Sequence, residues 1–373
     1  MKLKFLILSP FVSFLWTSAA GAQQAGPQIS GSALQASNIL NPNISVIGWF
    51  QGEAGHKKLG EGEEAPPGFQ LREAEIAFQS VVDPYARADF FMAVEGGGKV
   101  DLEEGYLTWF HLPCDLALKI GKFKGNFGKF NRVHAPETAF ADRPLAHEKY
   151  FGEEGLASFG GSLSWYVPNP WLFINLDAEA LNMPEAEEVP AFGKAERKDL
   201  LYLGRLGGYY DLTESLNISL GSNYAHGVAG QEFNDVSLSS KTLRSRIYGL
   251  DLTFRWKDPA RAIYRSVLWQ TEILWDKRDI SSVSALTSMG LFSHLEYQFA
   301  RRWRMGGRYD WSESPAANTR HESGGLLYLT FMPSEFSLIS LQGKQVNKAD
   351  GITERLGFIK VTFNIGPHGA HPF

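Results

Sequence analysis

The sequence predicts an all-β protein, a transmembrane antiparallel β-barrel of about sixteen strands with a long loop after the fifth strand. Three observations lead to this prediction. Apolar and polar side chains alternate with a period of two, and the connections between the alternating segments are short and long in turn. After residue 22 no run of about 18 or more apolar residues follows, which excludes a single membrane-spanning helix, whereas barrel strands need only about 9–11 residues.

The N-terminus has the composition of an export signal. Lys2 and Lys4 precede an apolar run at residues 5–16, and Ala20-Gly21-Ala22 supplies the small residues of a cleavage site. We expect residues 1–22 to be a signal peptide, residues 23–43 a polar periplasmic segment, and residues 44–373 the barrel. An uncleaved anchor is the alternative, but the apolar run is short for a bilayer of about 30 Å.

The strand pattern is clearest at residues 248–256. Tyr248, Leu250 and Phe254 share one face, and Asp251 and Arg255 share the other. A helix cannot separate these sets, because its neighbours recur at three and four residues. The same alternation predicts strands near residues 44–51, 70–81, 85–94, 100–112, 115–123, 155–167, 171–182, 200–212, 215–225, 245–256, 266–277, 288–299, 303–313, 323–332, 336–344 and 354–365. About fourteen or eighteen strands would result if an element is merged or split.

The connections alternate in length. The short ones are Val82-Asp83-Pro84, Pro113-Cys114, Pro168-Asn169-Pro170, Thr213-Glu214, Ala300-Arg301-Arg302 and Pro333-Ser334-Glu335, and long polar ones lie at residues 52–69, 183–199, 227–244 and 314–322. Outer-membrane barrels have short periplasmic turns and long external loops, and an even strand count returns both termini to the periplasm. We therefore expect the protein in a bacterial outer membrane, surrounded by its lipid. The sheet must close, since no backbone edge can stay unpaired in lipid.

The composition agrees with a barrel. Aromatic residues make up 13% of the chain, there are 38 glycines, and the mean hydropathy is −0.20. Aromatic belts lie at both membrane interfaces of barrels. We expect this role for Trp49, Trp109, Trp165, Trp171, Trp269, Trp275, Trp303 and Trp311, with a sugar-binding aromatic track as the alternative.

Charge and cysteine content exclude several classes. The chain has 36 basic and 41 acidic residues, a formal net charge of −5, which gives no reason to expect a nucleic-acid partner. A single cysteine, Cys114, excludes a disulfide framework and a cysteine-rich metal site, and we expect a reduced thiol in a turn. His368 and His371 are metal-ligand candidates, but exposed terminal histidines are more often inert. We predict no metal and no cofactor.

The longest connection, residues 124–155, carries most of the candidate site. Loops of this length are uncommon unless functional. We expect it to fold into the lumen and narrow the pore, with an external loop that caps the barrel as the alternative. The candidates for solute contact at this constriction are Lys119, Lys122, Lys124, Lys129, Arg132 and Arg143.

This part of the chain resembles a known family. The segments LALKIGKFKGNFGKFN, preceded by EEGYLTW, and RPLAHEKYFGEEGLASFGGSLSW are similar to porins of the phosphate-selective type and their porin-like relatives. The resemblance covers roughly residues 102–165. It implies a sixteen-stranded barrel, frequently a homotrimer, that conducts small hydrophilic solutes.

The predicted lumen wall carries mixed charge. Its inward-facing basic residues are Arg87, Lys119, Arg205, Arg255, Arg304, Arg308 and Lys360, and its acidic residues are Glu73, Glu75, Asp89, Glu104, Asp177, Glu179, Asp251, Glu272, Glu296 and Asp310. Strong anion selection needs basic residues with few acids between them. The phosphate specificity is therefore not transferred with the resemblance, and we expect most of these charges to pair across neighbouring strands.

Signatures of enzymes are missing from the sequence, which has no GxSxG, HExxH or P-loop motif and no GxGxxG between a strand and a helix. We predict a channel for passive diffusion of small hydrophilic solutes or ions, with anions such as phosphate among the candidates, and not an enzyme. One alternative is a structural or adhesive barrel with a plugged lumen. Another is an outer-membrane hydrolase that uses His294 and Glu296, although we place His294 inside the barrel.

Overall fold

The computed structural model describes residues 42–56, 68–184, 188–193, 198–229, 243–280, 284–315 and 321–366. The expected signal peptide, nearly all of the 23–43 segment, His368 and His371 lie outside these residues. The described part contains sixteen strands: β1 (Asn43–His56), β2 (Phe69–Asp83), β3 (Ala86–Glu95), β4 (Val100–Leu112), β5 (Leu116–Lys124), β6 (Ala157–Tyr166), β7 (Phe173–Asn182), β8 (Leu200–Thr213), β9 (Leu216–Val228), β10 (Arg244–Lys257), β11 (Ser266–Asp279), β12 (Ala285–Ala300), β13 (Trp303–Ser312), β14 (Glu322–Ser334), β15 (Ser337–Asn347) and β16 (Thr353–Ile365). Each predicted segment is a strand, so the count of sixteen is confirmed against fourteen and eighteen.

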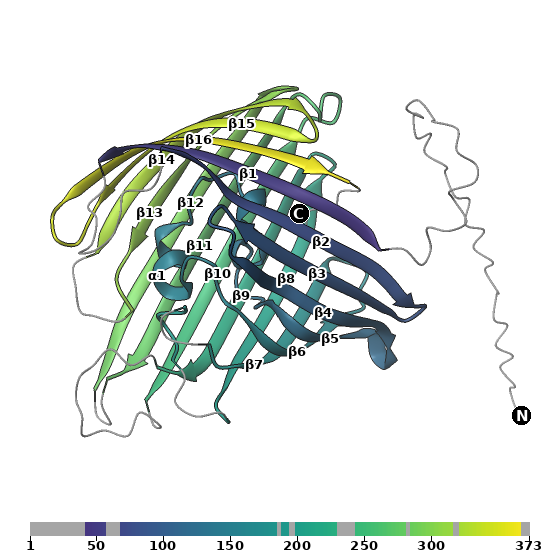
Figure 1. Ribbon diagram of the computed structural model, residues 1–373. Helices are drawn as coiled ribbons and strands as arrows, with labels where there is room; N and C mark the ends of the chain where they lie inside the picture. The colour runs from purple at the N-terminus through teal and green to yellow at the C-terminus, as the bar shows by residue number, and fades with distance from the viewer. Residues whose placement is uncertain are drawn as a thin grey trace, which may run out of the picture. The chain divides into compact units, whose positions relative to one another are not determined.

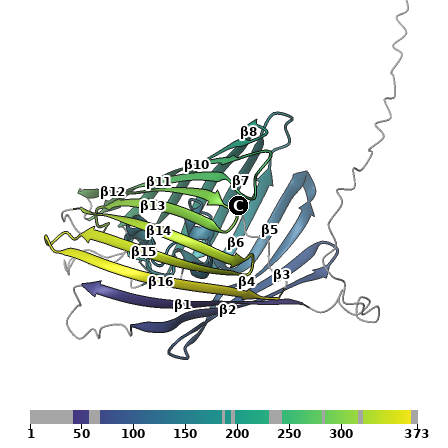
Figure 2. The same ribbon diagram turned by 90° about the horizontal axis from the view of Figure 1, so that it is seen from above.

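The strands form a closed antiparallel barrel (Figures 1 and 2). Every strand pairs with its neighbours in sequence, and β1 closes the ring by pairing with β16, from Val46 opposite Ile365 to His56 opposite Arg355. Closure pairs the edges of the first and last strands, which is the condition for a sheet in lipid. The predicted all-β transmembrane barrel is confirmed.

Alternate side chains on each strand have different surroundings. Leu250 on β10, Leu327 on β14 and Leu341 on β15 point outward and are 51%, 72% and 56% exposed. Asp251, the neighbour of Leu250, points inward and is 2% exposed. An apolar exterior around a polar interior suits a barrel surrounded by hydrocarbon. Within the described residues, no helix has the length and apolar character to cross a membrane.

One end of the barrel has tight turns. Two residues join β2 to β3 and two join β12 to β13, while the short 3-10 helix η1 (Pro113–Asp115) joins β4 to β5. Cys114 lies in this last turn with φ 66° and an exposed free thiol, as expected from the sequence. The long connections between β5 and β6, β7 and β8, and β9 and β10 lie at the other end.

The chain between β5 and β6 turns into the barrel, and we call residues 125–156 the lumen loop. It contains two 3-10 helices, η2 (Phe130–Arg132) and η3 (Ala135–Glu137), and the helix α1 (Leu145–Phe151), which lies inside the ring of strands (Figure 1). On α1 the Tyr150 hydroxyl donates a hydrogen bond to Ser288 Oγ of β12 at 2.8 Å. The external-loop alternative is therefore wrong.

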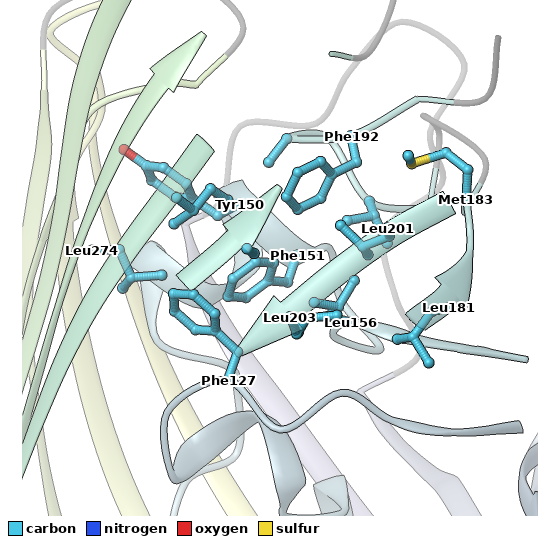
Figure 3. Packing of buried hydrophobic residues seen from close by; sticks show 14 of the residues in the cluster. Phe127, Tyr150, Phe151, Leu156, Leu181, Met183, Phe192, Leu201, Leu203 and Leu274 are labelled. Atoms are coloured by element: carbon cyan, nitrogen blue, oxygen red, sulfur yellow. The ribbon is translucent and has the colours of Figure 1, made fainter. Parts of the chain in front are cut away.

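An apolar cluster fixes one side of the lumen loop to the barrel wall (Figure 3). Its buried members come from the loop, from the wall strands and from the segment after β7: Phe123, Phe127, Ala146, Tyr150, Phe151, Leu156, Leu181, Met183, Val189, Ala191, Phe192, Leu201, Leu203, Ala225, Val228, Ile247 and Leu274. Inward-facing Leu and Ile on these strands depart from the polar-interior pattern. They do so because the loop, and not water, covers them.

The expected aromatic belts are supported for several tryptophans but wrong for Trp49. Trp165, Trp171, Trp269 and Trp303 are 38%, 76%, 40% and 37% exposed. Trp49 is only 4% exposed, and the Lys360 ammonium lies 4.5 Å from its ring centre inside the barrel. On β1, Trp49 points to the same inward face as Ile47 and Gln51, because side chains two residues apart share a face. Its position near the predicted strand end suggested a belt instead.

Candidate functional site

Glu272 on β11 holds the first part of the lumen loop. One carboxylate oxygen accepts hydrogen bonds from the backbone N–H groups of Lys129 at 2.9 Å and Phe130 at 2.8 Å. The other lies 2.9 Å from His147 Nε2 of α1. Glu272 is 2% exposed, so the loop shields its charge from water while its hydrogen bonds stabilise that charge. A predicted lumen-wall residue thus serves as an anchor.

A nearby part of the wall, on β13 and β15, holds the loop through Asp142. Its carboxylate lies 3.0 Å from the Arg308 guanidinium of β13 and also contacts the Lys344 ammonium of β15. Arg308 pairs in addition with Asp310 at 2.8 Å. Burial raises the pKa of Asp142, but Arg308 and Lys344 outweigh that effect and hold the pKa below its ordinary value. The loop carboxylate is therefore charged in its bound position.

Backbone groups complete this attachment. Lys360 on β16 donates to the carbonyl oxygens of Thr138 at 2.7 Å and Phe140 at 2.9 Å. The amide of Gln342 on β15 accepts from the N–H of Ala141 at 2.9 Å and donates to the carbonyl of Ala139 at 3.0 Å. A charged and an amide side chain thus replace water for loop groups that have no strand partner.

The third attachment is an acidic cluster on β2 and β4. His134 Nδ1 lies 2.6 Å from Glu103 Oε2 and 2.9 Å from Glu75 Oε2, and its Nε2 lies 2.6 Å from Glu104 Oε1. Neighbouring residues Glu103 and Glu104 both face inward because the register between β3 and β4 shifts here, Phe91 lying opposite Glu104 and Met92 opposite Leu102. Burial lowers the pKa of His134, but the surrounding carboxylates outweigh it and raise this pKa well above its ordinary value.

A cavity of about 680 Å³ lies beneath the lumen loop. It is lined by residues near the tight-turn end of the strands, such as Ser45, Arg87 and Ser219, and by the loop residues Asn126 and Arg132. The cavity is thus bounded by barrel wall on its sides and by the loop on one face.

Four predicted solute-contact residues line this cavity: Lys119, Lys124, Lys129 and Arg132. The Lys119 ammonium lies 4.4 Å from the Tyr106 ring centre, and Lys124 Nζ lies 3.7 Å from Glu103 Oε1. Burial lowers the pKa of Lys129 to about 8, and Arg132 acts in the same direction. Across the described part of the chain, neither Lys129 nor Arg132 forms an ion pair at contact distance.

No protein-family model matches the chain. A protein of Aquifex aeolicus (strain VF5), described as uncharacterized, is 30% identical over 363 residues, an alignment that spans 88% of this chain and 75% of that protein. The chain belongs to the same family as this Aquifex protein.

Several solved structures share the fold of this chain at low sequence identity. Pseudomonas putida OprB has a TM-score of 0.58 at 9% identity and covers 87% of this chain and 94% of its own. The anion-selective porin from Comamonas acidovorans has a TM-score of 0.55 at 10% identity, and the alignment covers 87% of this chain and 98% of that porin. OmpT of Vibrio cholerae, an outer membrane protein solved in a trimer form, has a TM-score of 0.55 at 10% identity. The alignment covers 87% of this chain and 100% of OmpT. The chain therefore has the fold of outer-membrane porins.

Two predicted solute-contact residues lie elsewhere in this barrel. Lys122 lies two residues after Ile120, which is 49% exposed on the outer face, so both side chains share that face. The Lys122 ammonium donates to the Leu102 carbonyl at 2.6 Å. The period of two on β5 therefore points Lys122 away from the lumen. Arg143 lies within the loop, where it donates to the Glu153 carbonyl at 3.0 Å and lies 5.4 Å from the Phe130 ring centre. It connects two parts of the loop and does not line the cavity.

The predicted lumen-wall residues face inward and many form ion pairs, but most of these pairs lie within one strand or skip a strand and do not join adjacent strands as expected. Arg87 pairs with Asp89 at 2.7 Å, Arg205 with Asp251 at 2.6 Å, and Arg304 with Glu296 at 3.5 Å. Arg255 has the parity of Asp251 and so also faces inward. Glu104, Glu272, Arg308 and Lys360 instead bind the lumen loop. Mixed charge on the wall is thus used mainly for structure.

Several anchoring residues carry no local signal in the sequence. Gln342 and Lys344 are ordinary inward positions of β15, and nothing in their local sequence marks contact with residues about 200 positions earlier. Glu103 was missed because strict alternation assigns one of two adjacent acids to lipid. The pair Glu103-Glu104 before Gly105 is itself a signal, since a charge facing lipid is costly and a bulge avoids it.

His294 and Glu296, the residues of the hydrolase alternative, lie inside the barrel. The Tyr328 hydroxyl lies between them, 2.7 Å from His294 Nε2 and 2.7 Å from Glu296 Oε2. His294 is 4% exposed beneath the loop residue Phe140, whose ring centre lies 4.8 Å away. Its described hydrogen-bond partner is a tyrosine and not a serine nucleophile.

Proposed function

We propose that this protein is a water-filled channel of the bacterial outer membrane that allows passive diffusion of small hydrophilic solutes, and that it is not an enzyme. The single observation that carries this proposal is the lumen loop, which contacts β11 on one side of the closed barrel and β2 and β4 on the other, and which bounds a cavity lined by charged groups. A loop attached at both walls fixes the size of the passage, and its charged side chains fix which ions pass.

The free basic groups at the cavity support a modest preference for anions, with phosphate as one candidate. Among the residues that the structure describes, Lys119, Lys129 and Arg132 face the cavity without a carboxylate at contact distance. Asp177 and Glu179 face the same cavity, but each accepts hydrogen bonds from nearby groups, including Ser164 at 2.6 Å and Ser162 at 3.0 Å. The acids limit the preference, so we propose selection by charge and not a dedicated phosphate site.

Planar-bilayer recording tests this proposal. Purified protein should give stepwise currents, and the reversal potential in a KCl gradient should show chloride preferred over potassium. K129E and R132E should each shift this potential toward cation preference. K99E is the matched control, because Lys99 lies in the exposed β3–β4 hairpin, where its partner is Glu95. Folded protein without current would contradict the channel, and unchanged selectivity in K129E and R132E would contradict the loop's role.

The apolar cluster favours a second candidate, a structural barrel whose lumen is plugged. Phe127, Phe151 and Leu156 pack against wall residues such as Leu203 in the way of a protein core, not a water-filled pore (Figure 3). A variant in which residues 126–155 are replaced by a short Gly-Ser linker separates the two candidates. Current in both proteins supports the channel, whereas current only in the shortened variant supports a plug.

We also propose a homotrimer surrounded by outer-membrane lipid. The similarly folded Vibrio cholerae OmpT has been solved in a trimer form. The apolar exterior around Leu250, Leu327 and Leu341 supports lipid contact over the β10 to β15 part of the wall. Light scattering of the detergent complex measures the number of chains, and a mass of a single chain would contradict the trimer.

A further inference from the structure

His134 brings one end of the lumen loop into a cluster of carboxylates that the channel proposal does not use. Glu75 on β2, Glu103 on β4 and His134 each offer one ligand atom, and these atoms lie within 4.8 Å of one another. The three residues are 3%, 7% and 5% exposed. They come from three separate segments of the chain, so folding alone creates the cluster.

The cluster has more hydrogen-bond acceptors than its donors can satisfy. One imidazole nitrogen carries at most one hydrogen, yet His134 Nδ1 lies 2.6 Å from Glu103 Oε2 and 2.9 Å from Glu75 Oε2. Within the described part of the chain, Glu75 Oε2 and Glu103 Oε1 are buried acceptors without a hydrogen-bond donor, and so is Glu73 Oε1 on the same strand as Glu75. Buried acceptors without donors are rare and require an explanation.

The charge count also favours an added cation. Glu73, Glu75, Glu103 and Glu104 supply four carboxylates, while Lys124 is the ammonium within ion-pair distance, 3.7 Å from Glu103. Arg143 interacts with Glu103 at longer range. Carboxyl groups held together without water repel strongly when ionised, and an added cation would relieve this repulsion.

The second imidazole nitrogen is already positioned as in metal sites. His134 Nε2 lies 2.6 Å from Glu104 Oε1, and metal-bound histidines usually donate their other N–H to a carboxylate. A bound metal ion would displace the hydrogen of Nδ1 to solvent while Nε2 keeps its own, and the Nδ1 lone pair would then point between Glu75 and Glu103. Imidazole and carboxylate ligands together suit Zn²⁺ and related divalent ions.

We propose that Glu75, Glu103 and His134 Nδ1 bind a divalent transition-metal ion, with Zn²⁺ as the probe, and that Glu104 orients His134. In tetrahedral zinc sites, ligand atoms about 2.1 Å from the ion lie about 3.4 Å apart, so these side chains need to separate by less than about 1 Å. Water can supply the remaining ligand, because Glu75 and His134 line the cavity beneath the loop. The bound ion would connect the lumen loop to the β2 and β4 wall.

Isothermal titration calorimetry of the folded, chelator-treated full-length protein with Zn²⁺ tests this site. We expect one ion per chain, a loss of at least about tenfold in affinity for E75Q and E103Q, and about tenfold for E104Q. E179Q is the matched control, since Glu179 lines the same cavity from β7 without belonging to the cluster. The double variant H368A/H371A should also bind as the natural sequence does.

Absence of Zn²⁺ binding, or unchanged affinity in both E75Q and E103Q, would overturn the site. If these variants do not fold, zinc-edge X-ray absorption of the loaded natural sequence decides, with one imidazole and otherwise oxygen ligands expected. Several imidazoles, or none, would overturn it. The inference is independent of the proposed channel: protein that conducts without binding Zn²⁺ rejects the metal site alone, and protein that binds Zn²⁺ without conducting rejects the channel alone.

Discussion

Asp142 of the lumen loop and Arg308 of β13 form a 3.0 Å ion pair in which the guanidinium is completely buried. Arg308 also pairs with Asp310, and Lys344 contacts Asp142 from the next strand but one. Two wall cations thus share one loop carboxylate. Such a network fixes the loop in one position, because any displacement leaves buried charges without partners.

Removing the charge of Asp142 should loosen the loop. We expect D142N to weaken the attachment by roughly 3–5 kcal/mol, the range for losing one partner of a buried ion pair. Single-channel recording should then show larger and noisier current steps. D89N is the control, because Asp89 pairs with Arg87, a side chain that is 42% exposed, and does not contact the loop. Equal current noise in the two variants would refute the anchoring role.

The same pair predicts a dependence on acid. The pKa of Asp142 lies below its ordinary value in the folded protein, so its contribution to stability is complete above about pH 4. That contribution is lost as the pH falls through the folded-state pKa. Current noise in the natural sequence should therefore rise below about pH 4, whereas D142N should lack this component. Identical acid responses would show that another carboxylate controls the loop.

Most of the fold could be predicted from sequence because lipid and water impose different side chains on alternate positions. The segment 100–112 was predicted with both bounds correct, and β1 extends five residues beyond its predicted end at residue 51. Strand ends beyond the membrane are harder to predict, since both faces there meet water or other loops. His56 at the end of β1 is an example, with exposed neighbours in the sequence.

The site was only partly predictable. Lys129 and Arg132 were identified because a long loop with basic residues has a functional composition, and Lys119 because strand alternation points it inward. Lys122 was included although the same alternation points it outward. Anchors such as Glu272 depend on hydrogen bonds between residues 143 positions apart. Such contacts depend on how the barrel closes and on where the loop runs, and local sequence patterns predict neither. The apolar cluster was missed for the same reason, since its members look like lipid-facing residues.

Glu272 should be the most sensitive single anchor of the first half of the loop. E272A removes the acceptor for the Lys129 and Phe130 amides and the partner of His147. Loss of even one charge-assisted hydrogen bond, at about 1.5–3 kcal/mol, should speed hydrogen exchange in residues 125–134 by at least about tenfold. Mass spectrometry of the exchanged protein measures this.

The control for this experiment is E296A, because Glu296 accepts from Tyr328 and pairs with Arg304 but does not contact the loop. Its exchange in residues 125–134 should match that of the natural sequence. If E272A also matched it, the carboxylate would not hold the loop.

Phe151 should anchor the second half of the loop through packing alone. Its ring is 0% exposed and lies 5.1 Å from the Phe127 ring centre (Figure 3). F151A leaves a cavity among residues that cannot collapse onto a rigid barrel wall, and we expect a loss of about 3–5 kcal/mol. Urea unfolding in detergent measures this loss. F336A, in an exposed turn, should change the free energy of unfolding by much less, and equal losses would contradict the packing role.

Lys129 should make the charge preference of the channel depend on pH near neutrality. Burial lowers its pKa to about 8, and the nearby arginines support that shift against the attraction of Asp251. A lysine is charged below its pKa, so the constriction loses one positive charge as the pH rises from about 7 to 9. The chloride-to-potassium permeability ratio should fall over this interval.

K129M should show the lower ratio at both pH values, because it carries no charge at either, and K129R should keep the higher ratio to pH 9, since a guanidinium stays protonated. Reversal potentials in a KCl gradient, measured in one membrane at both pH values, provide the comparison. A pH-dependent ratio that persists in K129M would assign the titration to another group. A ratio that is constant in the natural sequence would mean that Lys129 stays charged or lies outside the ion path.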